Sequence, residues 1–178
     1  MRRAVLGMLL VPALVFGSSH TPTPLAERVH KADRIAVVQV LSSRTELYRG
    51  DVRKMLTHTE VVIGEVLKGP AVQPGLDRLT ITQLGGRHGL WESHVPGDAT
   101  FHEGETALVL LRCSPTPERC GLVGLGEGKV SLIGSDAFVF DLASNRYTRE
   151  PAAGFLTRLR ELAAAPPREP AASTGVAK

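Results

Sequence analysis

The chain has 178 residues, of which 43% are hydrophobic and only 4% are aromatic, so its length and composition fit one domain with an aliphatic core and terminal tails. Its net charge is +3, and leaving out Arg2 and Arg3 at the start lowers it to +1, with 19 basic against 18 acidic side chains. This balance, with no cluster of Lys and Arg, argues against nucleic acid as the main partner. The 18 Gly and 12 Pro predict many turns and few long helices.

The first residues are typical of an export signal. A short basic start precedes an apolar run over residues 4–16 that is short for a bilayer span and is interrupted by Pro12. We expect cleavage after Gly17 or Ser19, which makes residues 1–19 a signal peptide; the alternative is an N-terminal membrane anchor. After cleavage we expect no membrane span and a periplasmic, cell-surface or secreted location.

The first part of the domain is predicted to contain a helix and two strands. Residues 20–24 are expected to be a linker, and a short helix is expected over Leu25–Lys31. The first strand, "ADRIAVVQVLSS", has a continuous apolar run that indicates burial on both faces. The charged residues 43–55 are expected to be a polar connection to the second strand, "THTEVVIGEVLKG".

The later part of the chain is predicted to alternate strands with loops before a final helix. The expected elements are a third strand "DRLTITQL", a long irregular loop over residues 85–103, a fourth strand "ETALVLLRC", a bent strand or hairpin "GLVGLGEGKVSLIG" and a short strand "DAFVFDL". Residues 147–165 are expected to end in a helix whose apolar stripe caps an open end or face of the barrel; the stripe is formed by Phe155, Leu156, Leu159 and Leu162. The domain then spans residues 25–165, and residues 166–178 are expected to be a disordered tail.

The two cysteines flank a Pro-rich turn. A hairpin would bring Cys113 and Cys120 within disulfide distance, and an exported chain meets an oxidising compartment. The alternative is two free thiols. One Cys pair does not make a zinc site, which needs four ligands, and a disulfide would remove both thiolates as nucleophiles.

Several short motifs, in order, resemble those of exported bacterial domains of the tissue-inhibitor-of-metalloproteinase-like (netrin-like) kind. The motifs are Ala32-Asp33, Val66-Leu67-Lys68-Gly69, Gly85-Gly86, Phe101-x-x-Gly104-Glu105 and Gly126-x-Gly128-Lys129. The resemblance covers roughly residues 25–135. It implies a mainly β fold, a five-stranded Greek-key barrel of the OB type with a short N-terminal helix and a C-terminal capping helix. The animal inhibitors chelate a protease zinc through an N-terminal Cys, and this chain has no Cys near its mature start, so that mechanism is not carried over.

The best candidate for a binding surface is the segment 85–103. Its Gly85-Gly86-Arg87-His88-Gly89 turn is either the corner where a strand leaves the barrel or an anion nest with Arg87 supplying charge. Long loops of this kind are often functional. Trp91, the only Trp, is either an exposed binding anchor or a lid on the core. We take Arg87, His88 and Trp91 as the candidate binding residues.

No catalytic, cofactor or metal site is predicted. His88, His94 and His102 lie in or beside this segment, but their spacings of six and eight residues match no helix face or known ligand pair. We therefore expect a non-enzymatic module that binds another exported or cell-envelope protein through residues 85–103. The alternative is a secreted hydrolase, metal-dependent or not, which requires the three histidines to converge in one pocket with a carboxylate.

Overall fold

The computed structural model describes residues 23–73, 75, 77–115, 118–141 and 144–166. The predicted signal peptide and nearly all of the predicted tail lie outside these residues. In chain order the elements are α1 (Leu25–Lys31), β1 (Arg34–Leu47), a 3-10 turn (Tyr48–Gly50), β2 (Met55–Lys68), β3 (Arg78–Leu84), β4 (Gly86–His88), β5 (Trp91–Ser93), β6 (Thr106–Pro115), β7 (Glu118–Leu122), a second 3-10 turn (Leu125–Gly128), β8 (Lys129–Ile133), β9 (Asp136–Asp141), β10 (Arg146–Pro151) and α2 (Ala152–Ala164). None of the helices in the described part of the chain combines the length and apolar character that a bilayer crossing requires.

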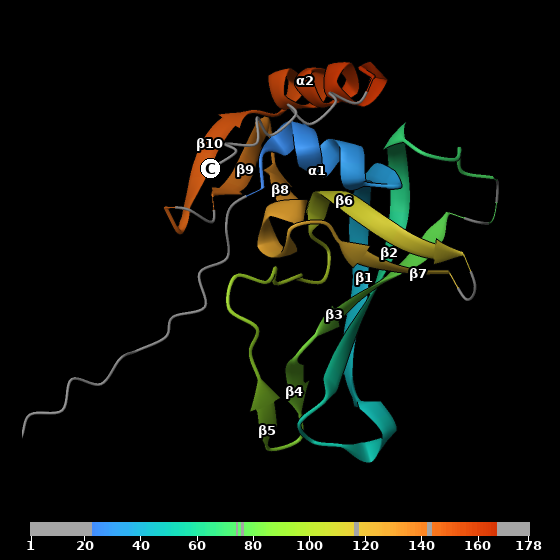
Figure 1. The fold of residues 1–178 in the computed structure, drawn as a ribbon, viewed down its shortest axis with the longest axis vertical. Coiled ribbons are helices and arrows are strands. Elements are labelled where there is room, and N and C mark those ends of the chain that lie inside the picture. The colour runs from blue at the N-terminus through green and yellow to red at the C-terminus, as the bar shows by residue number, and fades with distance from the viewer. Residues whose placement is uncertain (1–22, 74, 76, 116–117, 142–143, 167–178) are drawn as a thin grey trace, which may run out of the picture.

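Five strands close into a barrel in the order β1-β2-β3-β7-β6, with β6 pairing back onto β1 (Figure 1). All neighbours are antiparallel except β3 and β7, which run parallel with Ile81 opposite Cys120. This arrangement confirms the predicted mainly β fold with a five-stranded OB-type barrel. Cys113 and Cys120 face each other across β6 and β7, and their sulfur atoms lie 2.10 Å apart, at disulfide-bonding distance.

The barrel has one core inside it and a second core on its outer face. On β1, Ala36, Val38 and Val40 are buried in the interior cluster, whereas Ile35 is buried in the outer one. Burial on both faces explains the continuous apolar run of this strand and confirms that prediction.

Both helices lie over the outer core, at the opposite end of the molecule from β4 and β5 (Figure 1). Phe155 and Leu159 of α2 are fully buried there, and Leu156 and Leu162 pack against them, so the predicted apolar stripe covers a face of the barrel. The helix begins only at Ala152, because the preceding residues form β10, which pairs with β9.

Two predicted segments differ from the structure. Residues 43–55 include the end of β1, which runs to Leu47, and the start of β2 at Met55, so the irregular connection is shorter than predicted. The two strands continue this far because Thr45 pairs with Thr57 across them. In the stretch 121–134, a 3-10 turn over Leu125–Gly128 separates the end of β7 from β8. Both strands pair with the same side of β6, because β1 pairs with its other side, so this stretch follows one strand path with an interruption and is not a hairpin.

Candidate functional site

Two projections extend from the barrel at the end away from the helices (Figure 1). One is the distal part of the β1–β2 hairpin, residues 43–59, which we call the arm. The other is a ribbon of β4 and β5, residues 86–93, in which Gly86 faces Ser93 and His88 faces Trp91 across a Gly89-Leu90 turn. The prediction that residues 85–103 form an irregular loop is therefore wrong for the ribbon. The sequence signal that could have identified the ribbon was Gly89 between two short runs of residues, which is typical of a hairpin turn.

Two glycines let the ribbon lie directly against the arm. Gly85 and Gly86 have φ angles of 88° and 121°, which favour glycine. A Cβ at Gly86 would lie 2.2 Å from Thr57 Oγ1 and 2.5 Å from Thr45 Oγ1. The Gly85-Gly86 pair therefore forms a corner at which the backbone of Gly86 lies directly against the side chains of Thr45 and Thr57.

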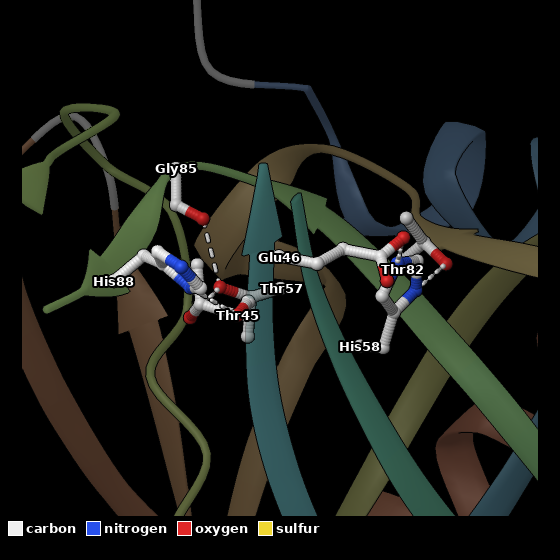
Figure 2. Close-up of polar contacts among 7 residues, drawn as sticks. All are labelled: Thr45, Glu46, Thr57, His58, Thr82, Gly85 and His88. Carbon is white, nitrogen blue, oxygen red and sulfur yellow. Dashed lines mark hydrogen bonds and ion pairs between the residues drawn. The ribbon is translucent and has the colours of Figure 1, made fainter. Parts of the chain in front are cut away.

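A chain of hydrogen bonds fastens this contact (Figure 2). Thr57 Oγ1 donates to the carbonyl of Gly85 at 2.7 Å, so the hydroxyl of Thr45, 3.0 Å away, donates to Thr57. His88 lies at the other end of the ribbon contact, with Nδ1 donating to the carbonyl of Thr45 at 3.1 Å. The ribbon is thus held to the arm at both its root and its tip.

A polar cleft of about 290 Å³ lies between the arm, the ribbon and the segment that returns to β6. Phe101, which belongs to the barrel core, closes its inner end. Hydroxyls line one wall, where Ser43 and Thr59 pair at 2.5 Å. The opposite wall is held by Gln83, whose Nε2 donates to Asp98 Oδ1 at 2.8 Å. The cleft can accept a small polar group or side chain, since its lining offers donors and acceptors over an aromatic base.

The ribbon exposes large apolar side chains. Leu90 is 98% exposed and Trp91 is 59% exposed, and Leu84 at the root of the ribbon is 67% exposed. Of the two alternatives for Trp91, an anchor at the surface or a lid on the core, the structure shows the side chain at the surface. Arg87 lies beside His88 on β4 and faces Glu92 on β5. The three predicted binding residues therefore share one ribbon.

The three histidines do not converge. His88 contacts the arm, His94 is exposed at the cleft, and the backbone N–H of His102 donates to Glu105 Oε2 at 3.1 Å. In the described ranges no three or more His, Cys, Asp or Glu side chains gather in a way that could hold a metal ion. The convergence that the hydrolase alternative requires is not found.

A second polar group, which the sequence analysis missed, spans β1, β2 and β3. His58 Nδ1 lies 3.1 Å from Thr82 Oγ1, and its Nε2 lies 2.9 Å from Glu46 Oε1. Figure 2 shows this group apart from the Thr45–Thr57 contact. The order hydroxyl, imidazole, carboxylate is that of hydrolase triads, but these residues do not line the cleft. We interpret the group as a cross-strand clamp. The sequence signal for this group was the alternation in "THTE", which places the side chain of His58 on the other face of the strand from its two Thr neighbours.

A buried ion pair anchors the segment that leads from the ribbon back into the barrel. Lys129 Nζ contacts Glu105 at 2.7 Å and the carbonyl of Thr100 at 2.5 Å, and Ser131 donates to Glu105 at 2.6 Å. Burial acts to raise the pKa of Glu105. The hydrogen bonds from Lys129 and Ser131 and the charge of Lys129 outweigh burial and hold that pKa below its ordinary value. Through the carbonyl of Thr100, which lines the cleft, this ion pair holds the wall formed by the segment that returns to β6.

Comparisons with models of protein families and with curated proteins found no match to this chain.

Proposed function

We propose that the protein is an exported, non-enzymatic interaction module of the cell envelope or the secreted fraction, which docks another exported or cell-envelope protein with its ribbon. We also propose that it belongs with the netrin-like OB domains that its motifs resemble. The observation that carries the proposal is the exposure of Leu90 and Trp91 at the end of a ribbon held by hydrogen bonds.

An exposed Trp on a braced hairpin suits protein recognition. Trp brings a large contact area with few rotatable bonds, and such residues dominate the binding energy of many interfaces. Because Gly86 and His88 fix the ribbon against the arm, little further ordering is needed when a partner binds. Arg87 and Glu92 flank the apolar tip and supply a polar rim.

The cleft beside the ribbon gives the partner a second point of contact. It is too small for a domain and large enough for one or two side chains. A partner loop that packs on Trp91 can therefore place a polar side chain against the hydroxyls of Ser43 and Thr45. Export is supported by the basic and apolar start of the chain and by the disulfide distance between Cys113 and Cys120.

The proposal is tested by capture with matched baits. Oxidised chain starting near residue 20 is compared with Trp91→Ala and with Ile133→Ala, a control that truncates an equally exposed apolar side chain on β8. Captured proteins are purified and titrated against each bait by calorimetry. We expect Trp91→Ala to weaken binding by about 2 kcal/mol, roughly thirtyfold, and Ile133→Ala to leave it unchanged.

Two outcomes contradict the proposal. One is a purified partner that binds all three baits equally, which would place the interface elsewhere. The other is binding of the chain to anionic lipid vesicles, lost with Trp91→Ala, without any protein partner. In that case the apolar tip would insert into a lipid surface.

A further inference from the structure

The strand β10 leaves one long side of the sheet open. It is the last strand in the order β8-β9-β10, and in the described part of the chain no strand pairs with its other side. Its side chains are exposed except at Glu150, which is half-buried. β10 lies beside the helices, far from the ribbon (Figure 1), so a contact at this edge would leave the proposed binding end accessible.

The direction of each backbone group on β10 follows from one hydrogen bond. The N–H of Ala152 donates to the carbonyl of Ser135 at 2.8 Å, one step beyond the last pair of β9 and β10. Hydrogen-bonded pairs alternate along an antiparallel ladder, so the even-numbered residues of β10 bond to β9. Tyr147 and Arg149 therefore turn their N–H and C=O groups toward the open side. Pro151 also faces this side, where its missing N–H breaks no ladder bond.

We propose that β10 pairs antiparallel with β10 of a second copy of this chain, about a twofold axis that passes between the two Thr148 residues. In this register Tyr147 faces Arg149 of the second copy, and the two residues exchange backbone hydrogen bonds on each side of the axis. Arg146 faces Glu150 of the second copy, twice by symmetry.

Side-chain charge favours this register over two alternative registers. The direction of the backbone groups would also allow the twofold axis to pass between the two Tyr147 residues or between the two Arg149 residues. The first places Arg146 opposite Thr148 and forms no ion pair between the strands. The second places two Arg149 side chains opposite each other, and like charges in that position are destabilising.

The charges on β10 have a second effect. Charged side chains on an edge strand ordinarily discourage pairing with other strands. The charges from Arg146 to Glu150 discourage pairing with most other strands in the same way. They are complementary to the charges of the same strand in a second copy that runs antiparallel.

The contacts already made by β10 are compatible with this pairing. Glu150 Oε1 accepts a hydrogen bond from Arg158 at 2.9 Å, and a carboxylate has acceptor sites on two oxygens, so it can also accept from Arg146 of the second copy. Arg149 pairs with Asp136 of β9 at 2.6 Å, so its charge already has a partner within the same chain. One short strand buries little area, so we expect a weak dimer that forms at high protein concentration.

The first test exploits the symmetry of the two ion pairs. Sedimentation equilibrium of the full mature chain from micromolar to millimolar concentration should show dimerisation. Arg146→Glu and Glu150→Arg should each raise the dimer dissociation constant by about tenfold, because each places like charges opposite each other twice. An equimolar mixture of the two variants should associate again, since both cross-strand pairs are then of opposite charge.

The second test fixes the register. Under oxidation, Thr148→Cys should form a disulfide-linked dimer, because Thr148 faces itself in a pair with closely spaced Cα atoms. Arg146→Cys, which faces Glu150, is the matched control and should not. Trp91→Ala should dimerise as the parent does, which separates this proposal from that for the ribbon.

Three results overturn the proposal. They are a chain that stays monomeric up to millimolar concentration, charge variants that associate unchanged, and cysteine variants that cross-link equally at both positions.

Discussion

Substituting Gly86 with alanine tests whether the ribbon depends on direct contact with the arm. The backbone at Gly86 has φ of 121°, in a region that side chains other than glycine rarely adopt. The added Cβ would also meet the hydroxyls of Thr57 and Thr45 at 2.2 and 2.5 Å. Since both distances are far shorter than van der Waals contact, the ribbon must move away from the arm.

The magnitude follows from two separable parts. Holding alanine at this φ costs about 1–2 kcal/mol. Breaking the hydrogen bonds from Thr45 to Thr57 and from Thr57 to Gly85 costs about 1 kcal/mol each. The total loss in the free energy of unfolding is therefore about 3–4 kcal/mol.

Urea unfolding measures this loss, and hydrogen exchange of the ribbon amides locates it. The control is Gly89→Ala in the same ribbon, where φ is 60° and no atom lies within 4 Å of the added Cβ, so only about 1 kcal/mol should be lost. In a background of Thr45→Ala and Thr57→Ala, the cost of Gly86→Ala should fall to the backbone part alone. A loss at Gly86 no larger than that at Gly89 would refute the reasoning.

Three further predictions concern the groups that hold the barrel together. Because the folded state lowers the pKa of Glu105, its pairing with Lys129 stabilises the fold above the ordinary carboxyl pKa near 4.3. This stabilisation is lost as pH falls through the lower pKa of the folded state. Urea unfolding at a series of pH values should therefore show a smaller loss of stability toward acid pH in Glu105→Gln than in the parent. Replacing Cys113 and Cys120 with serine should lower the free energy of unfolding by about 2 kcal/mol, whereas equal stability of reduced and oxidised parent would contradict the bond. His58→Ala should cost about 1–3 kcal/mol in thermal unfolding, and a neutral result would remove its role as a clamp.

Much of the barrel could be predicted from local patterns. The apolar run around Ile35 and Val38 indicated a strand buried on both faces, and the spacing of Phe155 and Leu159 indicated a helix with one apolar side. These features depend on neighbours within a few residues, so the sequence carries them directly. The pairing of the two cysteines followed from a short turn between strands in the same way.

The parts that could not be predicted depend on distant contacts. The arm was missed because its charged residues concealed the alternation that places Thr45 and Thr57 on one face. The ribbon was missed because each of its strands has only three residues and is stable only against the arm. The pair of Glu105 and Lys129 joins residues 24 positions apart, and nothing local to either residue indicates the other.

The parallel seam of the barrel also sets the order in which the protein can fold. β1, β2 and β3 follow one another along the chain, as do β6 and β7, so each group can form early from contacts between chain neighbours. The pairing of Ile81 with Cys120 and the pairing of β1 with β6 join the two groups across long loops, so we expect both to form after the groups themselves. The ribbon and the arm that holds it both belong to the first group, so the proposed binding end can assemble before the barrel closes.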